Sequence, residues 1–390
     1  MRILHIFDHS LPRRTGYALR SHAVIAEQRA RGWQTVQLTG PAHGSAGADP
    51  DGWQFFRTRP AAPPLARAPL LSHWLAARAL SSRIRQVVRL TRPQILHAHA
   101  PPLNGIAALR VGRRCRLPVI YEARDWWTDP ERDAGIVARM ASAAETWVAR
   151  HADGVAASSH AMLGELRARG ARGPGALIPP AIDPYSTGCA PSNAVQLRSQ
   201  LDLGPGPVIA YVGELREHEG VALLLDALPR ILLASPSARL LVAGDGPALG
   251  ALRSQADMRG ITRHTIFATD AAPGQMHHYY PLADVLVFPR LPSRHAALCV
   301  PFLPLEAMAH GSAVAASDTG GHAELIENGR TGLLFEPGSA EALAATVIGL
   351  LSDPLQQARI RTQARRFVVE RRTWEASVAR YAPLYQRMLR

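Results

Sequence analysis

The chain alternates short apolar strands with helical segments, and this alternation runs through the sequence twice. In the first half, helices are predicted near 17–31 and 72–90, between segments rich in β-branched and other apolar residues. Those segments predict strands at 2–7, 33–38, 95–98, 119–121 and 154–157. Strands and helices that alternate at this spacing are typical of parallel βαβ units.

A second set of such units follows a segment rich in proline and glycine at 179–206. Its predicted strands lie at 208–211, 238–243, 265–267, 285–288, 313–316 and 332–335. We therefore expect two doubly wound α/β domains in tandem, with a ligand in the cleft between them at the carboxyl ends of the strands.

The expected domain boundaries follow from this pattern. An N-terminal Rossmann-like domain is predicted at 1–185, a linker at 186–206 and a C-terminal Rossmann-like domain at 207–372. The last segment, 373–390, reads as one amphipathic helix with Trp374, Val378, Tyr381 and Tyr385 near one face. We expect this helix to pack back towards the N-terminal domain.

Composition agrees with a globular cytoplasmic protein. A length of 390 residues with 47% hydrophobic residues can supply two cores. The first residues lack the apolar length of a signal peptide, and no stretch approaches the roughly 18 apolar residues of a membrane span. Three isolated cysteines, Cys115, Cys189 and Cys299, indicate neither a disulfide framework nor a zinc cluster.

The positive charge is concentrated in the first half. All 44 basic residues are arginine, and residues 1–190 hold 25 of them against 13 acidic residues. A basic surface attracts nucleic acid, anionic membranes or phosphorylated substrates. The arginines are scattered, and no aromatic-interleaved nucleic-acid motif accompanies them. We therefore expect peripheral contact with an anionic membrane and no nucleic-acid partner.

Three glycine-containing loops follow predicted strands of the second half. They contain Gly213, then Gly244 and Gly246, and then Asp318 with Gly320 and Gly321. A glycine loop between a strand and a helix can present backbone N–H groups to an anion, although glycine also serves any tight turn. Three such loops at one sheet edge favour an anionic ligand.

Glu306 opens a predicted helix between the last two of these loops. A carboxylate there can cap the helix, because it suits the positive helix terminus. It can also accept hydrogen bonds from the two hydroxyls of a ribose. Its position among the glycine loops favours the second role.

These motifs together resemble the donor half of retaining family-4 glycosyltransferases. The resemblance rests on 305–311, 317–321, Glu324-Leu325-Ile326, 329–334, Pro337-Gly338, Ala283-Asp284-Val285 and Gly244-Asp245-Gly246-Pro247. In the first half, Gly16-Tyr17, Leu96-His97-Ala98-His99, Leu103-Asn104-Gly105 and Tyr121-Glu122-Ala123-Arg124 resemble the branch found with exosortase (PEP-CTERM) and exopolysaccharide systems. The likeness covers nearly the whole chain.

The resemblance implies a GT-B fold with an interdomain cleft, an acceptor-binding N-terminal domain and a nucleotide-sugar-binding C-terminal domain. It implies retention of anomeric configuration, no cofactor and no metal. Glu306 would hold the ribose as the main catalytic-site residue, and Gly16 would approach the donor phosphates. The implied donor-binding set is Gly16, Gly213, Arg216, Gly244, Gly246, Leu305, Glu306, Asp318, Gly320 and Gly321.

The sequence departs from this family at three places. No Asp or Glu occurs within 285–305, where the family commonly has an acid that contacts the donor sugar. Glu214 and Glu219 stand where the family commonly has cations, and Leu303 stands where some branches have lysine. Carboxylates are the wrong charge for gripping a diphosphate. Arginines elsewhere could compensate, namely Arg216, Arg290 or Arg294.

The predicted acceptor site lies at the strand ends of the first half. We assign His99 a catalytic or acceptor-side role, and Asn104, Glu122 and Arg124 contacts to the acceptor. Glu122 and Arg124 could alternatively form only a local ion pair. His97 and His99 are expected to point to opposite faces of their strand, so that they do not bind a metal jointly.

The sequence thus predicts a retaining glycosyltransferase that moves a sugar to a lipid-linked or polysaccharide acceptor at the inner membrane face. Two alternatives stay open. A catalytically weakened GT-B partner protein would bind nucleotide or another transferase without turnover. A sugar-nucleotide epimerase or phosphorylase could use the same fold.

Overall fold

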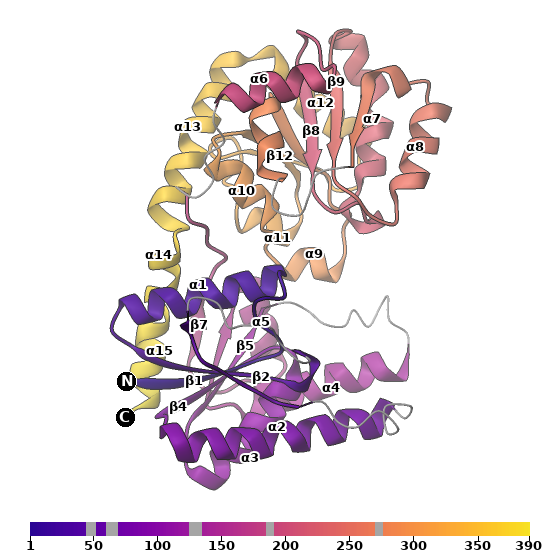
Figure 1. The fold of residues 1–390 in the computed structure, drawn as a ribbon. Helices are drawn as coiled ribbons and strands as arrows, with labels where there is room; N and C mark the ends of the chain where they lie inside the picture. Colours follow the sequence, from indigo (N-terminus) through magenta and orange to yellow (C-terminus); the bar gives the residue numbers. More distant parts are fainter. Residues whose placement is uncertain (44–51, 60–68, 125–134, 185–190, 270–275) are drawn as a thin grey trace. The chain divides into compact units, whose positions relative to one another are not determined.

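The computed structural model describes every residue except 44–51, 60–68, 125–134, 185–190 and 270–275 (Figure 1). The chain forms two compact units. The first contains residues 1–179 and 374–390, and the second contains residues 180–373. Each unit is a parallel sheet covered by helices.

The first unit has seven parallel strands in the order β3-β2-β1-β4-β5-β6-β7. These are β1 (Arg2–Phe7), β2 (Gln34–Thr39), β3 (Phe55–Arg57), β4 (Ile95–His99), β5 (Val119–Ala123), β6 (Gly154–Ala157) and β7 (Gly175–Leu177). Every residue of β4, β5 and β6 is buried. Strands that are covered on both faces consist of nearly continuous apolar residues, and this pattern allowed them to be predicted from the sequence.

Helices cover both faces of this sheet. The helices are α1 (Gly16–Ala30), α2 (Pro69–Thr91), α3 (Pro102–Cys115), α4 (Ile136–His151), α5 (His160–Ala168), α14 (Trp374–Ala379) and α15 (Tyr381–Met388). Helices α2, α3 and α4 pack side by side on one face (Figure 1). Helices α1, α14 and α15 share a core on the other face, where Val24 and Leu384 meet Ile3 and Ile120.

The second unit has six parallel strands in the order β10-β9-β8-β11-β12-β13. These are β8 (Val208–Val212), β9 (Arg239–Ala243), β10 (Thr265–Ala268), β11 (Val285–Phe288), β12 (Ala313–Ser317) and β13 (Leu333–Phe335). The helices of this unit are α6 (Pro191–Gln200), α7 (Val221–Ala234), α8 (Leu249–Met258), α9 (Arg294–Leu298), α10 (Leu303–Ala309), α11 (Gly320–Ala323), α12 (Ala340–Ser352) and α13 (Pro354–Arg371). Short 3-10 turns connect them at 217–219, 262–264 and 276–282.

Two sequence predictions differ from the structure. Part of the expected linker, 191–200, is helix α6, because Leu197 packs against the second core and Arg198 donates to the Gly204 and Gly206 carbonyls. The expected single helix at 373–390 is two helices, α14 and α15, which meet at Arg380.

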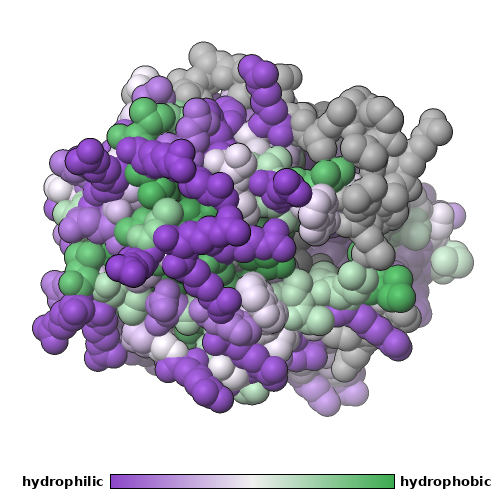
Figure 2. Space-filling model, turned by 90° about the horizontal axis from the view of Figure 1, so that it is seen from below, coloured by the Kyte–Doolittle hydropathy of each residue, from purple (hydrophilic) through white to green (hydrophobic). Residues whose placement is uncertain are grey.

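The surface mixes charged and apolar residues. Figure 2 shows a face on which hydrophilic residues predominate and apolar residues form small areas between them. Within the described residues, no helix combines the length and apolar character needed to cross a membrane. Cys115 is exposed and Cys299 is buried, and Cys189 lies outside the described residues.

Candidate active site

Two of the predicted glycine loops lie against each other at the carboxyl edge of the second sheet. Gly213 follows β8, and its amide donates to the Ala243 carbonyl at the end of β9 (2.9 Å). A Cβ atom on Gly244 would lie 1.9 Å from the Gly213 oxygen, and one on Gly246 would lie 2.4 Å from the Leu215 oxygen. The backbones approach too closely for side chains, so packing alone requires glycine at 244 and 246.

The third loop is packed in the same manner. A Cβ atom on Gly320 would lie 2.5 Å from the Ala297 oxygen, and one on Gly321 would lie 2.1 Å from the Cys299 oxygen. The exposed Asp318 precedes them at the end of β12. All the predicted glycines of the second unit therefore lie along one sheet edge, where β9, β8, β11 and β12 end as neighbours.

Glu306 lies in the first turn of α10, with its side chain partly buried. The Tyr280 hydroxyl donates to Glu306 Oε2 at 2.9 Å. Burial raises the pKa of Glu306, and the hydrogen bond from Tyr280 partly opposes that shift. Leu305 is fully buried in the core instead of lining the sheet edge, so its side chain is not available to a donor.

The charged residues of the β8 loop pair with each other or with the neighbouring loop. Arg216, which the sequence places in the donor site, is exposed and lies 2.7 Å from the Glu214 carboxylate. Arg290 follows β11 and lies 2.7 Å from the Glu219 carboxylate, with both side chains largely buried. A cation therefore lies beside Glu219, a position where the family commonly has a cation, but it comes from the adjacent loop.

The close approach of these two loops has a structural cause. Gly220 has a left-handed backbone (φ +74°), and a Cβ atom there would lie 2.0 Å from the Pro289 oxygen. The amide of Leu291, in the loop after β11, donates to the carbonyl of His218, in the loop after β8 (2.9 Å). These contacts hold Arg290 next to Glu219.

Gly16 belongs to the first unit and differs from the other predicted glycines. It is exposed at the start of α1, and a Cβ atom there would meet no atom within 4 Å. The side chain of Thr15 caps the helix by accepting from the Ala18 amide. Packing therefore does not require glycine at position 16.

Glu122 is the centre of a buried polar cluster in the first unit. Its Oε1 accepts from Arg124 at 2.8 Å, and its Oε2 accepts from the Tyr381 hydroxyl at 2.5 Å. Nitrogen atoms of His97 and His99 lie 3.2 and 3.3 Å from the same Oε2. Burial would raise the pKa of Glu122, but Arg124 and the two histidines outweigh it and hold that pKa well below its usual range.

His97 and His99 point to the same face of β4, and the expectation of opposite faces is wrong. Side chains alternate along a strand, so residues two apart share a face. Their rings stack with centroids 4.2 Å apart. His5 on the neighbouring strand β1 lies 3.0 Å from His99 and 2.8 Å from Gln28, and Tyr385 lies 2.7 Å from His97.

His5, His97 and His99 could in principle hold a metal ion, since one ligand nitrogen from each lies within 4.8 Å of the others. Each of their ring nitrogens already faces a protein atom at 3.3 Å or less. Burial lowers the pKa of all three, and a neighbouring cation or histidine adds to the effect. We interpret the group as a neutral hydrogen-bonding cluster.

The predicted acceptor residues are mostly framework residues. His99, Asn104 and Glu122 are fully buried, and Asn104 donates to the His99 carbonyl at 2.8 Å. Their side chains therefore cannot touch an acceptor in this conformation. Arg124 is also buried; it donates to Ser21 at 2.6 Å and lies over the Tyr17 ring. The local ion pair, which the sequence left open for Glu122 and Arg124, is the interaction observed.

Family models match both units. A glycosyl transferase 4-like domain model matches residues 15–181, and a glycosyl transferases group 1 model matches residues 196–367. The chain thus joins a glycosyl transferase 4-like domain to a group 1 glycosyl transferase domain. The exosortase branch within this group is not distinguished by these matches.

Solved structures share the whole fold. The Anabaena protein HepE, solved in complex with UDP, superposes with a TM-score of 0.78 at 19% identity and covers 99% of this chain and 100% of its own. Sucrose-phosphate synthase from Thermosynechococcus elongatus gives 0.77 at 20% identity, with 99% and 98% covered. The fold is GT-B, with two Rossmann-like parallel-sheet domains, as the sequence predicted.

Curated relatives are glycosyltransferases. A GDP-mannose-dependent phosphatidylinositol monomannoside mannosyltransferase of Mycolicibacterium smegmatis is 30% identical over 210 residues, which is 53% of this chain and 55% of that one. The chain thus spans about half the length of that relative. Glycogen synthase of Mycobacterium tuberculosis is 29% identical over 302 residues, covering 76% and 69%.

Sequence reasoning missed the partners of the predicted residues. Tyr280 lies 26 positions before Glu306, in an irregular 3-10 segment, and nothing in the pattern links the two. His5 could have been found by aligning β1 beside β4, because Rossmann-like sheets place these strands next to each other.

Proposed function

We propose that this chain is a retaining, metal-independent glycosyltransferase, which moves a sugar from a nucleoside-diphosphate-sugar to a lipid-linked or polysaccharide acceptor. We further propose that it serves exopolysaccharide synthesis in an exosortase-associated system, at the inner face of an anionic membrane. The observation that carries the proposal is that helix α10, with Glu306 in its first turn, begins against a glycine loop of a GT-B fold: a Cβ atom on Gly213 would lie 2.6 Å from the Leu303 side chain.

In this proposal Glu306 accepts hydrogen bonds from the ribose hydroxyls of the donor. Tyr280 fixes one carboxylate oxygen and leaves Oε1 for a ligand. A carboxylate that accepts two hydroxyl hydrogen bonds binds a nucleotide by charge-assisted bonds. Two similar proteins support a nucleotide-sugar donor, since the mannosyltransferase is GDP-mannose-dependent and HepE was solved with UDP-glucose.

Arg290 is the proposed contact for the donor diphosphate. Its guanidinium lies at the carboxyl edge of the second sheet, held by Glu219, and a planar guanidinium can bind phosphate oxygens in a bidentate manner. The diphosphate would share Arg290 with Glu219 or displace it. Arg216, exposed and paired with Glu214, is the second available cation.

The rival proposal is a catalytically weakened GT-B partner protein. It is favoured by the pairing of Arg216 and Arg290 with carboxylates, which reduces the positive charge available to a leaving diphosphate. Loss of such electrostatic stabilisation typically costs about 10²–10³-fold in turnover. Such a protein would bind nucleotide or another transferase without transferring sugar.

Thermal unfolding with UDP, GDP, ADP and their sugars tests the donor site. One nucleotide should stabilise the protein, by about 2.7 kcal/mol at 100 times its Kd. Glu306→Ala should abolish this effect, whereas Glu336→Ala, at an exposed position of the same unit, should not. No shift with any nucleotide would contradict the transferase proposal and would favour a partner protein that binds another transferase.

Turnover separates the two proposals. Release of nucleoside diphosphate in the presence of membrane extract, unchanged by a metal chelator, would support the metal-independent transferase. Nucleotide binding without release would favour the partner protein. Interconversion of sugar nucleotides without any acceptor would instead identify an epimerase.

A further inference from the structure

Helix α4 of the first unit carries an apolar stripe on its exposed side. Ile136, Met140 and Trp147 are 76%, 46% and 38% exposed, and Ala143 between them is also exposed. Their spacing of four, three and four residues places all four on one side of a helix. The opposite side of α4, with Ala138, Glu145, Val148 and Ala149, is buried against the unit.

Large exposed apolar side chains in register on one helix face need an explanation, since the buried face of α4 already supplies the packing that the fold requires. Single exposed hydrophobic residues are ordinary, but a row of them marks an interaction surface. From Ile136 to Trp147 the row is roughly 16 Å long, at about 1.5 Å per residue.

Basic side chains border this stripe. Arg139 and Arg150 are exposed on one side of it, and His151 is exposed on the other. The guanidinium of Arg113, from the neighbouring helix α3, lies 5.8 Å from the Trp147 ring. The acid of α4, Glu145, is buried and accepts from the Tyr121 hydroxyl at 3.0 Å.

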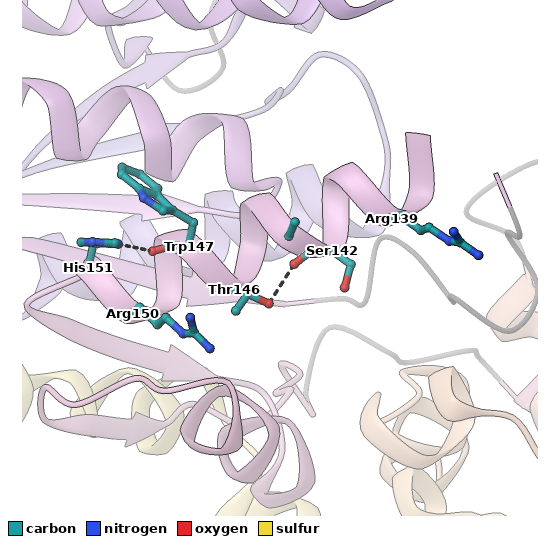
Figure 3. Close-up of a pocket in the computed structure, with 7 residues that line it drawn as sticks. Arg139, Ser142, Thr146, Trp147, Arg150 and His151 are labelled. Atoms are coloured by element: carbon teal, nitrogen blue, oxygen red, sulfur yellow. Dashed lines mark hydrogen bonds between the residues drawn. The ribbon is translucent and has the colours of Figure 1, made fainter. Parts of the chain in front are cut away.

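A hollow of about 530 Å³ follows the same helix (Figure 3). It is lined by Arg139, Ser142, Ala143, Thr146, Trp147, Arg150 and His151. Figure 3 shows Arg139 and Arg150 extending from the helix on the side of Ser142, with Trp147 on the other side. Guanidinium and hydroxyl groups can bind lipid phosphates, and an apolar stripe beside them can contact acyl chains.

We infer that the exposed face of α4, defined by Ile136, Met140, Ala143 and Trp147 with Arg139 and Arg150 at its border, docks on an anionic lipid bilayer. The apolar stripe enters the interface while the arginines contact lipid phosphates. A second copy of the chain fits this face less well, because two copies meeting there would bring the same cations together. Tryptophan, apolar in body and polar at its N–H, favours the interfacial depth.

This inference names the surface for the membrane contact in the proposed function, and it does not depend on catalysis. Vesicle binding can be measured without nucleotide, and nucleotide binding without vesicles. Failure of one therefore leaves the other measurable.

Co-sedimentation of the full chain with vesicles tests the inference. Vesicles of phosphatidylcholine alone are compared with vesicles that contain 30% phosphatidylglycerol, a chosen composition on the order of bacterial anionic lipid content. We expect binding to the anionic vesicles at low salt and weaker binding as salt rises, since the surface potential is screened within about 10 Å at 0.1 M.

Two double variants separate the two parts of the surface. Ile136→Ser with Met140→Ser should weaken binding at least tenfold at every salt concentration. Arg139→Ala with Arg150→Ala should remove most of the preference for anionic vesicles, about fivefold per arginine. Leu233→Ser and Arg359→Ala, at exposed positions of α7 and α13 in the second unit, are the matched controls and should bind as wild type.

Three results would overturn the inference. The wild-type chain could fail to bind anionic vesicles at low salt, or both double variants could bind as well as wild type. Light scattering could also show a dimer that the Ile136→Ser, Met140→Ser variant converts to monomer, which would assign the face to a second copy. Circular dichroism of each variant establishes that its fold is retained.

Discussion

The Tyr381 hydroxyl donates a 2.5 Å hydrogen bond to the Glu122 carboxylate, which lies 259 residues earlier in the chain. Both side chains are fully buried. Tyr385, one turn later on α15, contacts His97 at 2.7 Å. Helix α15 therefore supplies hydrogen-bond partners to buried polar groups of the first sheet. It contributes to the stability of the first unit, although it lies at the other end of the sequence.

We expect Tyr381→Phe to destabilise the first unit by about 1–3 kcal/mol, because the buried carboxylate loses a hydrogen-bond donor. Urea unfolding followed by circular dichroism measures the change. Gln386→Ala, at an exposed position of the same helix, should change stability by less than about 0.5 kcal/mol. Equal midpoints for Tyr381→Phe and wild type would mean that Arg124 and the two histidines satisfy Glu122 without the tyrosine.

The sequence predicted most of the fold because the strands are buried on both faces. The predicted strands at 2–7, 154–157 and 285–288 have the same bounds as β1, β6 and β11. The missed strands, β3 and β7, are three-residue edge strands. Their segments are too short to show alternation or a continuous apolar run.

The candidate site was less predictable, because its contacts join distant segments. A motif can place Glu306 at the start of a helix, but its contact with Tyr280 depends on how an irregular segment folds. In the first unit, the motif residues His99 and Glu122 looked available at strand ends. Glu122 is covered by Tyr381 of α15, which lies 259 residues later, and His99 stacks on Phe7 and His97, so that both are buried framework residues.

Glycine at position 244 should be essential to the second unit. In Gly244→Ala the new Cβ would lie 1.9 Å from the Gly213 oxygen, at a backbone φ of +145°. We expect a loss of several kcal/mol, since neither backbone segment can move without breaking the contact between the β8 and β9 loops. Calorimetry should show a lower Tm for one transition.

Gly250→Ala is the matched control for that variant. Gly250 lies within α8, and a Cβ atom there would meet nothing within 4 Å. Replacing glycine by alanine inside a helix is expected to stabilise by about 0.5–1 kcal/mol. If both variants had the wild-type Tm, the two loops would not be in the contact described.

Stability should fall as pH decreases from 7 to 5. Burial and the charge of Arg290 lower the pKa of His322 to about 3, and burial lowers the pKa of His5 and His99 well below 6.5. Below pH 6.5 these histidines take up protons in the unfolded chain but not in the folded one, so acid favours unfolding. The expected slope is up to about 1.4 kcal/mol per pH unit for each histidine.

Urea unfolding at several pH values measures that slope. His322→Asn should reduce this slope by up to about 1.4 kcal/mol per pH unit, because one buried neutral histidine is removed. A free energy of unfolding that stays constant from pH 7 to pH 5 would contradict the neutral state assigned to the buried histidines.

Removing the Tyr280 hydroxyl should change the pH dependence of nucleotide binding. The hydrogen bond from Tyr280 lowers the pKa of Glu306, while burial raises it, so Tyr280→Phe leaves only the raising effect. The proposed ribose contact needs the ionised carboxylate. Wild-type affinity should therefore weaken as pH falls towards the pKa of Glu306, and in Tyr280→Phe the weakening should begin at a higher pH.

Calorimetric titration with the nucleotide found by thermal unfolding, from pH 8 to pH 5, measures the pH dependence of affinity for both proteins. Glu306→Gln removes the titrating group and should give weak binding, about 10–100-fold below wild type, with little dependence on pH. Parallel curves for Tyr280→Phe and wild type would show that ionisation of Glu306 does not control nucleotide binding, and would remove the main support for its role at the ribose.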